Sequence, residues 1–308
     1  MPDNASNPKL PIYLDHAATT PCDPRVVEAM LPYFTTFFGN PGSRNHRFGW
    51  EAEEGVDKAR RQVADLIKSD EKEVIFTSGA TESNNLAIRG AAIMYEKAAE
   101  GSGKPRGHII SCAIEHKAVL DPCKRLQKEG FDVTFIEPPA DGIITADMIK
   151  AVMREDTILV SIMWANNEIG TINEIPQIGQ LCHDRNVIFH TDATQWAGKM
   201  PTNVEKDNID LMSWSSHKIY GPKGVGALYV RRRKPRVRLQ ALVDGGGQER
   251  GFRSGTLNVT GIVGFGKACE IARLEMDKDA VRLLDMRRWL EREITSRLDV
   301  CKVNGHAD

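Results

Sequence analysis

Residues 210–224, DLMSWSSHKIYGPKG, decide the fold. The apolar start predicts a strand, and the polar residues that follow predict a turn that ends on Lys218. Ser215, His217 and a glycine-rich loop surround this lysine in sequence. A lysine in such surroundings is suited to Schiff-base chemistry if desolvation lowers its pKa, although most lysines are only surface charges. Whether Lys218 has this function therefore depends on which residues lie at the ends of the other predicted strands.

Short apolar runs alternate with longer amphipathic stretches on the N-terminal side of this segment and just beyond it. Several of the runs show no polar alternation, which is expected for strands buried on both faces with helices as crossovers. The predicted strands are Val74–Thr77, His108–Ser111, Val133–Ile136, Ile158–Ile162, Val187–His190 and Gly226–Val230. The sequence therefore predicts the α/β class, with a mixed, mostly parallel sheet covered by helices on both faces.

The segment after the first predicted strand has the composition of a phosphate-binding turn. Residues 77–85, TSGATESNN, consist of a small-residue turn and a helix that begins near Thr81. Such a turn directs free backbone N–H groups and the positive end of a helix toward one point, which suits a phosphate. By itself the pattern is equally consistent with an N-cap in which Ser78 or Thr81 satisfies the first amides.

Two more strand ends carry a polar side chain. Asp192 follows an apolar strand, and a buried aspartate needs a partner such as a protonated pyridine nitrogen, unless it only caps the next helix. His116 can stack on an aromatic ring or move protons, unless it is a hydrogen-bonded structural histidine. Because carboxyl ends of parallel strands meet at one edge, these groups and Lys218 together form the set that a pyridoxal-phosphate (PLP) site requires.

The composition excludes several other classes of ligand. Lys plus Arg (41) nearly equals Asp plus Glu (42), so no overall field favours nucleic acid or a membrane surface. The basic run Arg231–Arg238 is interpreted as a solvated strand end or as a docking patch for an acidic protein. Residues 1–11 lack the features of a signal or transit peptide, and no run of roughly 18 apolar residues occurs. A cytoplasmic protein is expected.

The cysteines also indicate a cytoplasmic protein. Six cysteines without a Cys-x-x-Cys pair fit a reducing compartment, with each cysteine acting as a small buried hydrophobic residue and no metal site. A nucleotide-binding site of the Gly-x-Gly-x-x-Gly type is disfavoured, because no such turn follows the first predicted strand.

The order of the motifs resembles the cysteine desulfurases of the NifS/IscS type, within the class V aminotransferases and the fold-type I PLP enzymes (aspartate aminotransferase-like). The resemblance runs from Tyr13–Pro21 to at least Arg253–Thr256. The intervening motifs are Gly39–Ser43, Ser78–Ser83, Glu115–Lys117, Asn166–Gly170, Asp192–Gln195 and His217–Gly224. Each is modest alone, and in this order they are highly specific.

The resemblance implies a role for each matching residue. Lys218 would hold PLP as an imine and act with His116 in catalysis, while Asp192 would pair with the pyridine nitrogen. Asn167 and Gln195 would contact the substrate or the ring oxygen. Phosphate would be held by Ala80, Thr81, Ser215 and His217, and by Thr256 of the neighbouring subunit in a homodimer. The implied reaction converts L-cysteine to L-alanine and passes sulfur as a persulfide to an iron–sulfur scaffold protein or another acceptor.

The sequence also departs from that family. The stretch similar to Ser-Gly-Ser-Ala-Cys that carries the family's sulfur-accepting cysteine does not occur, so none of the six cysteines receives that role. Trp196 and Ser216 stand where smaller residues are common. The expected division is an N-terminal arm (1–17) that packs with the small domain, a large PLP-binding domain (18–263) and an incomplete small C-terminal domain (264–308). Alternatives are another class V lyase or aminotransferase, such as a selenocysteine lyase, or a non-catalytic PLP-binding dimeric module.

Overall fold

The computed structural model describes residues 10–101 and 106–306. Its eight α-helices there are α1 (Pro24–Met30), α2 (Pro32–Thr35), α3 (Arg47–Ile67), α4 (Ala80–Ala99), α5 (Lys117–Lys128), α6 (Ala146–Val152), α7 (Ile175–Asp184) and α8 (Val259–Thr295). The strands are β1 (Val74–Thr77), β2 (His108–Cys112), β3 (Asp132–Ile136), β4 (Thr157–Ser161), β5 (Ile188–Asp192), β6 (Leu211–Ser215) and β7 (Gly226–Val230). Each predicted strand is present, with ends that differ by one or two residues.

The seven strands form one mixed sheet in the order β1-β7-β6-β5-β4-β2-β3. Strand β7 is antiparallel to both of its neighbours, and all other pairs are parallel. The carboxyl ends of β1, β2, β4, β5 and β6 therefore lie at the same edge of the sheet. The predicted mostly parallel α/β sheet is confirmed.

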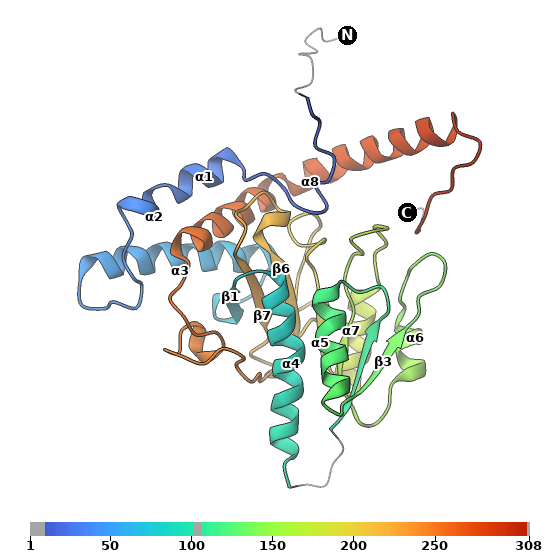
Figure 1. Ribbon diagram of the computed structural model, residues 1–308, viewed down its shortest axis with the longest axis horizontal. Coiled ribbons are helices and arrows are strands. Elements are labelled where there is room, and N and C mark those ends of the chain that lie inside the picture. The colour runs from blue at the N-terminus through green and yellow to red at the C-terminus, as the bar shows by residue number, and fades with distance from the viewer. Residues whose placement is uncertain (1–9, 102–105, 307–308) are drawn as a thin grey trace.

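Helices cover both faces of the sheet, as predicted. Helices α4 and α5 lie side by side on one face (Figure 1) and bury one set of alternating strand residues, including Ile109 and Leu159. On the other face, α3, α6, α7 and the first half of α8 bury the opposite set, including Ile110 and Val160. This alternation makes a three-layer core from strands that carry apolar residues on both faces.

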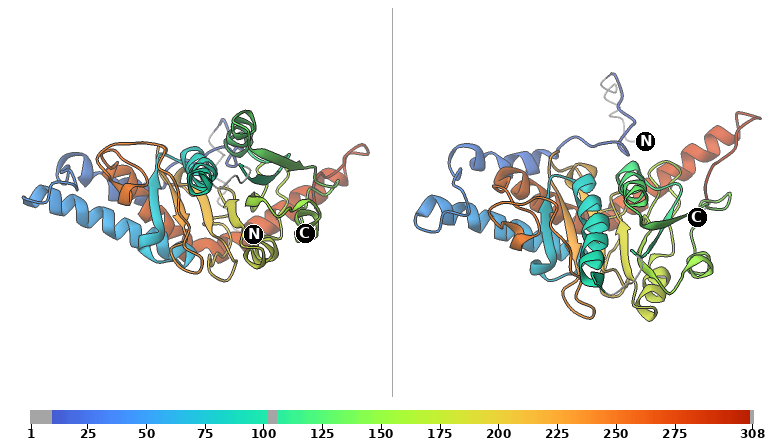
Figure 2. Two further views of the ribbon diagram at one scale, coloured as in Figure 1. Left: turned by 90° about the horizontal axis from the view of Figure 1, so that it is seen from below. Right: turned by 60° about the horizontal axis from the view of Figure 1, so that its bottom comes forward.

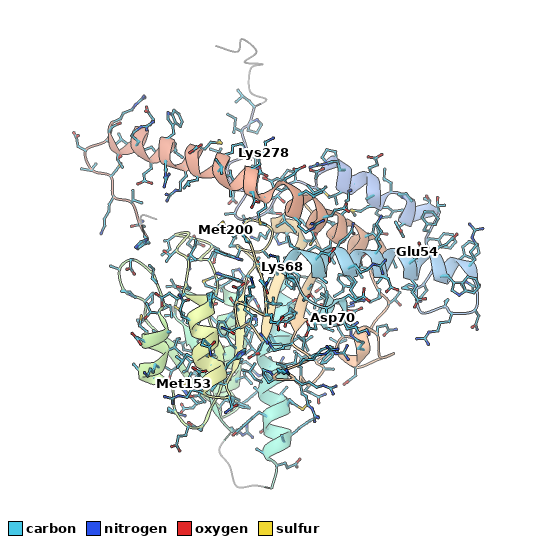
Figure 3. All side chains as sticks on the ribbon, turned by 180° about the vertical axis from the view of Figure 1, so that it is seen from behind. Glu54, Lys68, Asp70, Met153, Met200 and Lys278 are labelled. Carbon is cyan, nitrogen blue, oxygen red and sulfur yellow. The ribbon has the colours of Figure 1, made fainter. Side chains whose placement is uncertain are left out.

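Helix α8 packs along α3 and then extends beyond it (Figures 2 and 3). Its buried residues all lie between Gly261 and Cys269, whereas Leu274, Val281 and Trp289 are more than half exposed. The helix is continuous across residue 264, where the division between large and small domains is predicted. That division stays a prediction, as does the packing of the N-terminal arm with the small domain.

The basic run after β7 is only partly a solvated strand end. Residues 232–236 are exposed, but Arg231 is 7% exposed and pairs with the buried Asp210 at 3.1 Å. Its guanidinium also donates to the carbonyl oxygens of Val204 and Ile209. The expectation of a solvated end is wrong for this first arginine, because a buried carboxylate requires a cationic partner. For the rest of the run, docking of an acidic protein stays a prediction.

The loop after β7 is attached to β1 by a second buried ion pair. Arg60 of α3 and Glu249 are 8% and 6% exposed, and their closest N–O distance is 2.6 Å. Glu249 also accepts the backbone N–H of Phe76, and Arg60 donates to the carbonyl oxygen of Val74. The pair thus fixes α3, β1 and the loop around residue 249 relative to one another.

We expect Arg60→Met to lower the free energy of unfolding by about 3 kcal/mol, because it leaves the buried Glu249 carboxylate without its cation. Arg61→Met is the matched control, since Arg61 is the next residue of α3 and its pair with Glu71 is 4.0 Å long and exposed. The control is expected to change stability by less than about 1 kcal/mol in denaturant unfolding. Equal losses in the two variants would contradict the role of the buried pair.

Candidate functional site

A cavity of about 670 Å³ opens at the carboxyl edge of the sheet. It is lined by eight of the residues singled out from the sequence: Ala80, Thr81, His116, Asn167, Asp192, Gln195, His217 and Lys218. Ser215 lines the same cavity, so nine of the ten predicted site residues come together. The tenth, Thr256, is exposed and does not line it.

The cavity has one wall at the start of α4. This helix begins at Ala80 directly after β1, with Gly79 as a cap that offers no side chain. The first backbone N–H groups of the helix therefore have no intrahelical acceptor and no side-chain acceptor from the cap residue. The N–H of Ser78, just before the helix, donates to the carboxylate of Glu82. The amides and the positive helix end face the cavity, which favours an anion there.

Strand β7 packs closely against the turn between β1 and α4 that forms this wall. A Cβ on Gly226 would lie 2.6 Å from the carbonyl oxygen of Trp214 and 2.7 Å from the Cα of Gly79. Only a residue without a side chain can bring β7 so near the turn between β1 and α4. Ser215, at the end of β6 and 3% exposed, lies directly across from Gly79.

Asp192 is the buried carboxylate of the cavity. It is 5% exposed, and its Oδ2 accepts a hydrogen bond from Asn84 Nδ2 at 2.7 Å while its Oδ1 accepts the backbone N–H of Thr194 at 2.9 Å. Among the described residues, no Lys, Arg or His forms an ion pair with it. A buried carboxylate that is hydrogen-bonded yet has no cationic partner, and that faces a cavity, is suited to bind a ligand cation.

Asn84 is a functional candidate that the sequence analysis did not single out. It is fully buried on α4, and its Oδ1 has no hydrogen-bond partner in the described part of the chain. Its position one turn after the predicted phosphate turn was the available signal, because residues 80 and 84 share a helix face. The amide fixes one oxygen of Asp192 and so determines how the carboxylate points.

Burial disfavours the charged forms of two other titratable groups near Asp192, His190 and Glu115. Complete burial lowers the pKa of His190 to about 3, and this histidine instead bridges Ser161 (2.8 Å) and Ser213 (3.0 Å). Burial, followed by the charge of Asp192, raises the pKa of Glu115 well above its usual value, against the effect of the Met163 N–H that it accepts at 2.6 Å.

Lys218 lies on the opposite side of the cavity, next to the N-terminal segment. Its Nζ donates to the carbonyl oxygens of Ala17 (2.6 Å) and Ala18 (2.8 Å). Burial lowers the pKa of Lys218, while Asp192 and Asp15 act to raise it. A lowered pKa increases the fraction of free amine, the form that attacks a carbonyl.

The two histidines differ in what they offer to the cavity. His116 caps α5, and its Nδ1 accepts the backbone N–H of Ala118 at 3.1 Å, so Nε2 remains for a ligand. His217 Nδ1 is bonded to Thr19 Oγ1 at 3.0 Å, and burial, followed by the charges of Lys218 and Lys223, lowers its pKa. Both arrangements orient the imidazole rings before any ligand binds.

None of the six cysteines lines the cavity, and all of them lie in described residues. The interpretation as buried hydrophobic residues is confirmed for Cys112, Cys123, Cys182 and Cys269, whose pKa values burial raises, to about 12 for the first two. It is wrong for Cys301, which is exposed, and Cys22 is half-buried. A raised pKa disfavours the reactive thiolate.

The described residues contain no cluster of three or more His, Cys, Asp or Glu side chains arranged for a metal ion. Within the same residues, no helix has the length and apolarity needed to cross a bilayer.

Glu115 gives a pH-dependent contribution to stability whose sign is defined. Because its folded-state pKa is raised, the folded state is favoured below the unfolded-state pKa and loses stability as pH rises above it. Glu115→Gln removes this titration, so we expect the variant to gain thermal stability relative to the parent between about pH 5 and pH 8. Glu155→Gln, at an exposed position, is the control and is expected to show no such trend. A constant difference for Glu115→Gln across that range would contradict burial of its neutral form.

Known proteins resemble this chain along most of its length. The family described as Aminotransferase class-V matches residues 12–308. The cysteine desulfurase IscS of Anaeromyxobacter dehalogenans (strain 2CP-C) is 57% identical over 297 residues, which are 96% of this chain and 72% of that protein. That of Vibrio atlanticus (strain LGP32) is 57% identical over 302 residues, 97% of this chain and again 72% of the relative.

Solved structures agree with the sequence relatives. A NifS-like protein superposes with a TM-score of 0.86 at 40% identity, covering 92% of this chain and 76% of that one. DndA from Streptomyces lividans superposes with a TM-score of 0.84 at 42% identity, covering 96% and 81% of the two chains.

Proposed function

The chain belongs to the class V aminotransferase family, among the cysteine desulfurases of the NifS/IscS type, and on that premise we propose that the cavity at Lys218 binds PLP and converts L-cysteine to L-alanine. The observation that carries the assignment of the site is the buried Asp192, which faces Lys218 across one cavity and has no cationic partner among the described residues. Bound PLP would supply an electron sink and a covalent link to the substrate amine.

The residues present fit this cofactor. The start of α4, Ser215 and His217 offer donors for a phosphate, and the carboxylate of Asp192 suits a protonated ring nitrogen. The hydrogen bond from Asn84 Nδ2 keeps Asp192 oriented toward such a ring. Lys218 provides the amine, with a lowered pKa that favours its neutral form.

The remaining polar groups would act on the substrate. His116, with Nδ1 already accepting a backbone N–H, would stack on the ring and move a proton at Nε2. Lys218 would take and return a proton at Nζ once released from the cofactor. Asn167 and Gln195 would position the substrate or the ring oxygen from the cavity wall.

In the overall reaction the substrate C–S bond breaks, the carbon takes up a proton to give alanine, and a thiol accepts the sulfur as a persulfide. One cysteine plus one thiol thus gives one alanine plus one persulfide. No cysteine lines the cavity, so the accepting thiol would enter it from elsewhere. An iron–sulfur scaffold protein or another sulfur acceptor in the cytoplasm would then receive the sulfur.

The proposal includes a homodimer in which Thr256 of one subunit completes the phosphate site of the other. Exposed Thr256 follows a loop that Arg253 attaches to Glu82, with an N–O distance of 2.9 Å, near the start of α4. A group of large side chains on α2, the segment after it and the first turn of α3 is more than half exposed, namely Phe34, Phe38, Phe48 and Trp50. An apolar group of this kind is typical of a protein interface.

We expect the protein purified with PLP to be yellow, and borohydride reduction with peptide mapping to place a pyridoxyl group on Lys218. Lys218→Ala is expected to lose the visible absorption band and alanine formation from L-cysteine by at least 10³-fold, because the amine is removed. Lys223→Ala serves as the control, since Lys223 also lines the cavity but has no assigned covalent role. A pyridoxyl label on Lys223 or Lys199 would overturn the assignment.

A further inference from the structure

A second lysine, Lys199, is held behind the cavity by a packed loop between β5 and β6. Gly198 has φ +76°, and a Cβ there would lie 2.8 Å from Ile219, the residue after Lys218. Trp196 stacks on Trp164 with ring centroids 4.5 Å apart and an interplanar angle of 6°. Figure 3 labels Met200, the residue after Lys199, on the side of the sheet toward α8. The backbone before and at Lys199 is therefore fixed close to the Lys218 turn.

A chain of three hydrogen bonds connects the two lysines. Lys199 Nζ donates to Gln195 Oε1 at 2.7 Å, and Gln195 Nε2 donates to the carbonyl oxygen of Ala17 at 2.9 Å. Lys218 Nζ donates to the same carbonyl at 2.6 Å. Lys199 itself does not line the cavity, but Gln195 does. Lys199 thus contacts the site only through the amide of Gln195.

This contact defines which group Gln195 presents to the cavity. An amide has an oxygen that accepts and an NH₂ that donates two hydrogen bonds, and either end can point inward. With the oxygen engaged by an ammonium and one N–H engaged by Ala17, the group left for a ligand is the second N–H. Gln195 then suits a ligand oxygen that is negatively charged or accepts a hydrogen bond.

The positive charge of Lys199 also favours an anionic ligand oxygen next to Gln195. Burial, followed by repulsion from Lys218, lowers the pKa of Lys199 to about 8, so its ammonium is still the main form at neutral pH. The carboxylates that act on Lys218 are Asp192 and Asp15. A positive charge behind Gln195 favours an anionic oxygen in front of it and disfavours a further proton on the nitrogen of Lys218.

We propose that Lys199 is a positioning residue of the cofactor site, which fixes the Gln195 amide as a donor toward an anionic oxygen of the ligand. This inference rests on the proposed function and adds to it the reason why Gln195 binds as a donor. Lys199 takes no part in the chemistry itself; it acts on the ligand through the Gln195 amide and on the Lys218 nitrogen through its positive charge.

A double-mutant cycle with PLP affinity as the readout tests this role. Lys199→Met is expected to weaken PLP binding by roughly tenfold, because the Gln195 amide is no longer held in one orientation. In the Gln195→Met background the same change is expected to weaken binding by less than roughly twofold, since the group it acts through is gone. Independent losses that multiply in the double variant would overturn the proposal.

A spectroscopic titration separates this role from a purely structural one. In Lys199→Met, the pH midpoint of the visible band of the PLP-loaded protein is expected to rise by roughly one unit, because a positive charge near the Lys218 nitrogen is lost. Lys199→Arg keeps the charge and is expected to retain most of the parent midpoint. A loss of thermal stability in both variants with an unchanged midpoint would show a packing role only.

The control variant is Lys97→Met, which removes another lysine–glutamine hydrogen bond, 2.8 Å from Lys97 to Gln240 on the protein surface. It is expected to change neither the PLP affinity nor the midpoint. If Lys199→Met does not fold, Lys199→Gln provides the neutral side chain in the same comparison with Lys199→Arg. Borohydride labelling of Lys218 in each variant distinguishes failure of the proposed function from failure of the positioning role. Absence of label in the parent contradicts the proposed function, whereas a normal label with unchanged affinity in Lys199→Met contradicts only the positioning role.

Discussion

The burial of one charged carboxylate, that of Asp192, is the constraint on which the site depends. A carboxylate removed from water is costly unless hydrogen bonds and a cation compensate it. Here α4 contributes Asn84, the loop after β5 contributes the N–H of Thr194, and the cavity remains for a cationic group. The cavity is the place where the fold leaves that compensation to a ligand.

Two buried titratable residues, His190 and Glu115, surround Asp192. His190 precedes it by two residues on the same face of β5, and bonds to Ser161 and Ser213 hold this histidine neutral between adjacent strands. Glu115 is buried nearby with a raised pKa. Polar residues thus replace part of the apolar core under α4, and burial disfavours the charged forms of His190 and Glu115 there.

Segments remote in sequence hold the opposite side of the cavity. Thr20 donates through both its N–H and its hydroxyl to the carbonyl oxygen of His217, and its hydroxyl accepts the N–H of Tyr220. Ala17 accepts hydrogen bonds from both Lys218 and Gln195. The N-terminal segment therefore fixes the lysine-bearing turn about 200 residues later in the chain.

The sequence by itself determined the layered α/β fold, because runs without polar alternation such as Ile158–Ile162 are expected for strands buried between two layers of helices. It also placed Lys218, Asp192 and His116 at one edge, since parallel strands align their carboxyl ends. Only the tertiary structure decided which groups support them. Asn84 and Lys199 have no distinguishing local pattern, and their contacts with Asp192 and Gln195 follow from distances across separate elements or loops. The burial of Arg231 and the exposure of Cys301 were likewise set by packing, because a residue's type does not specify its neighbours.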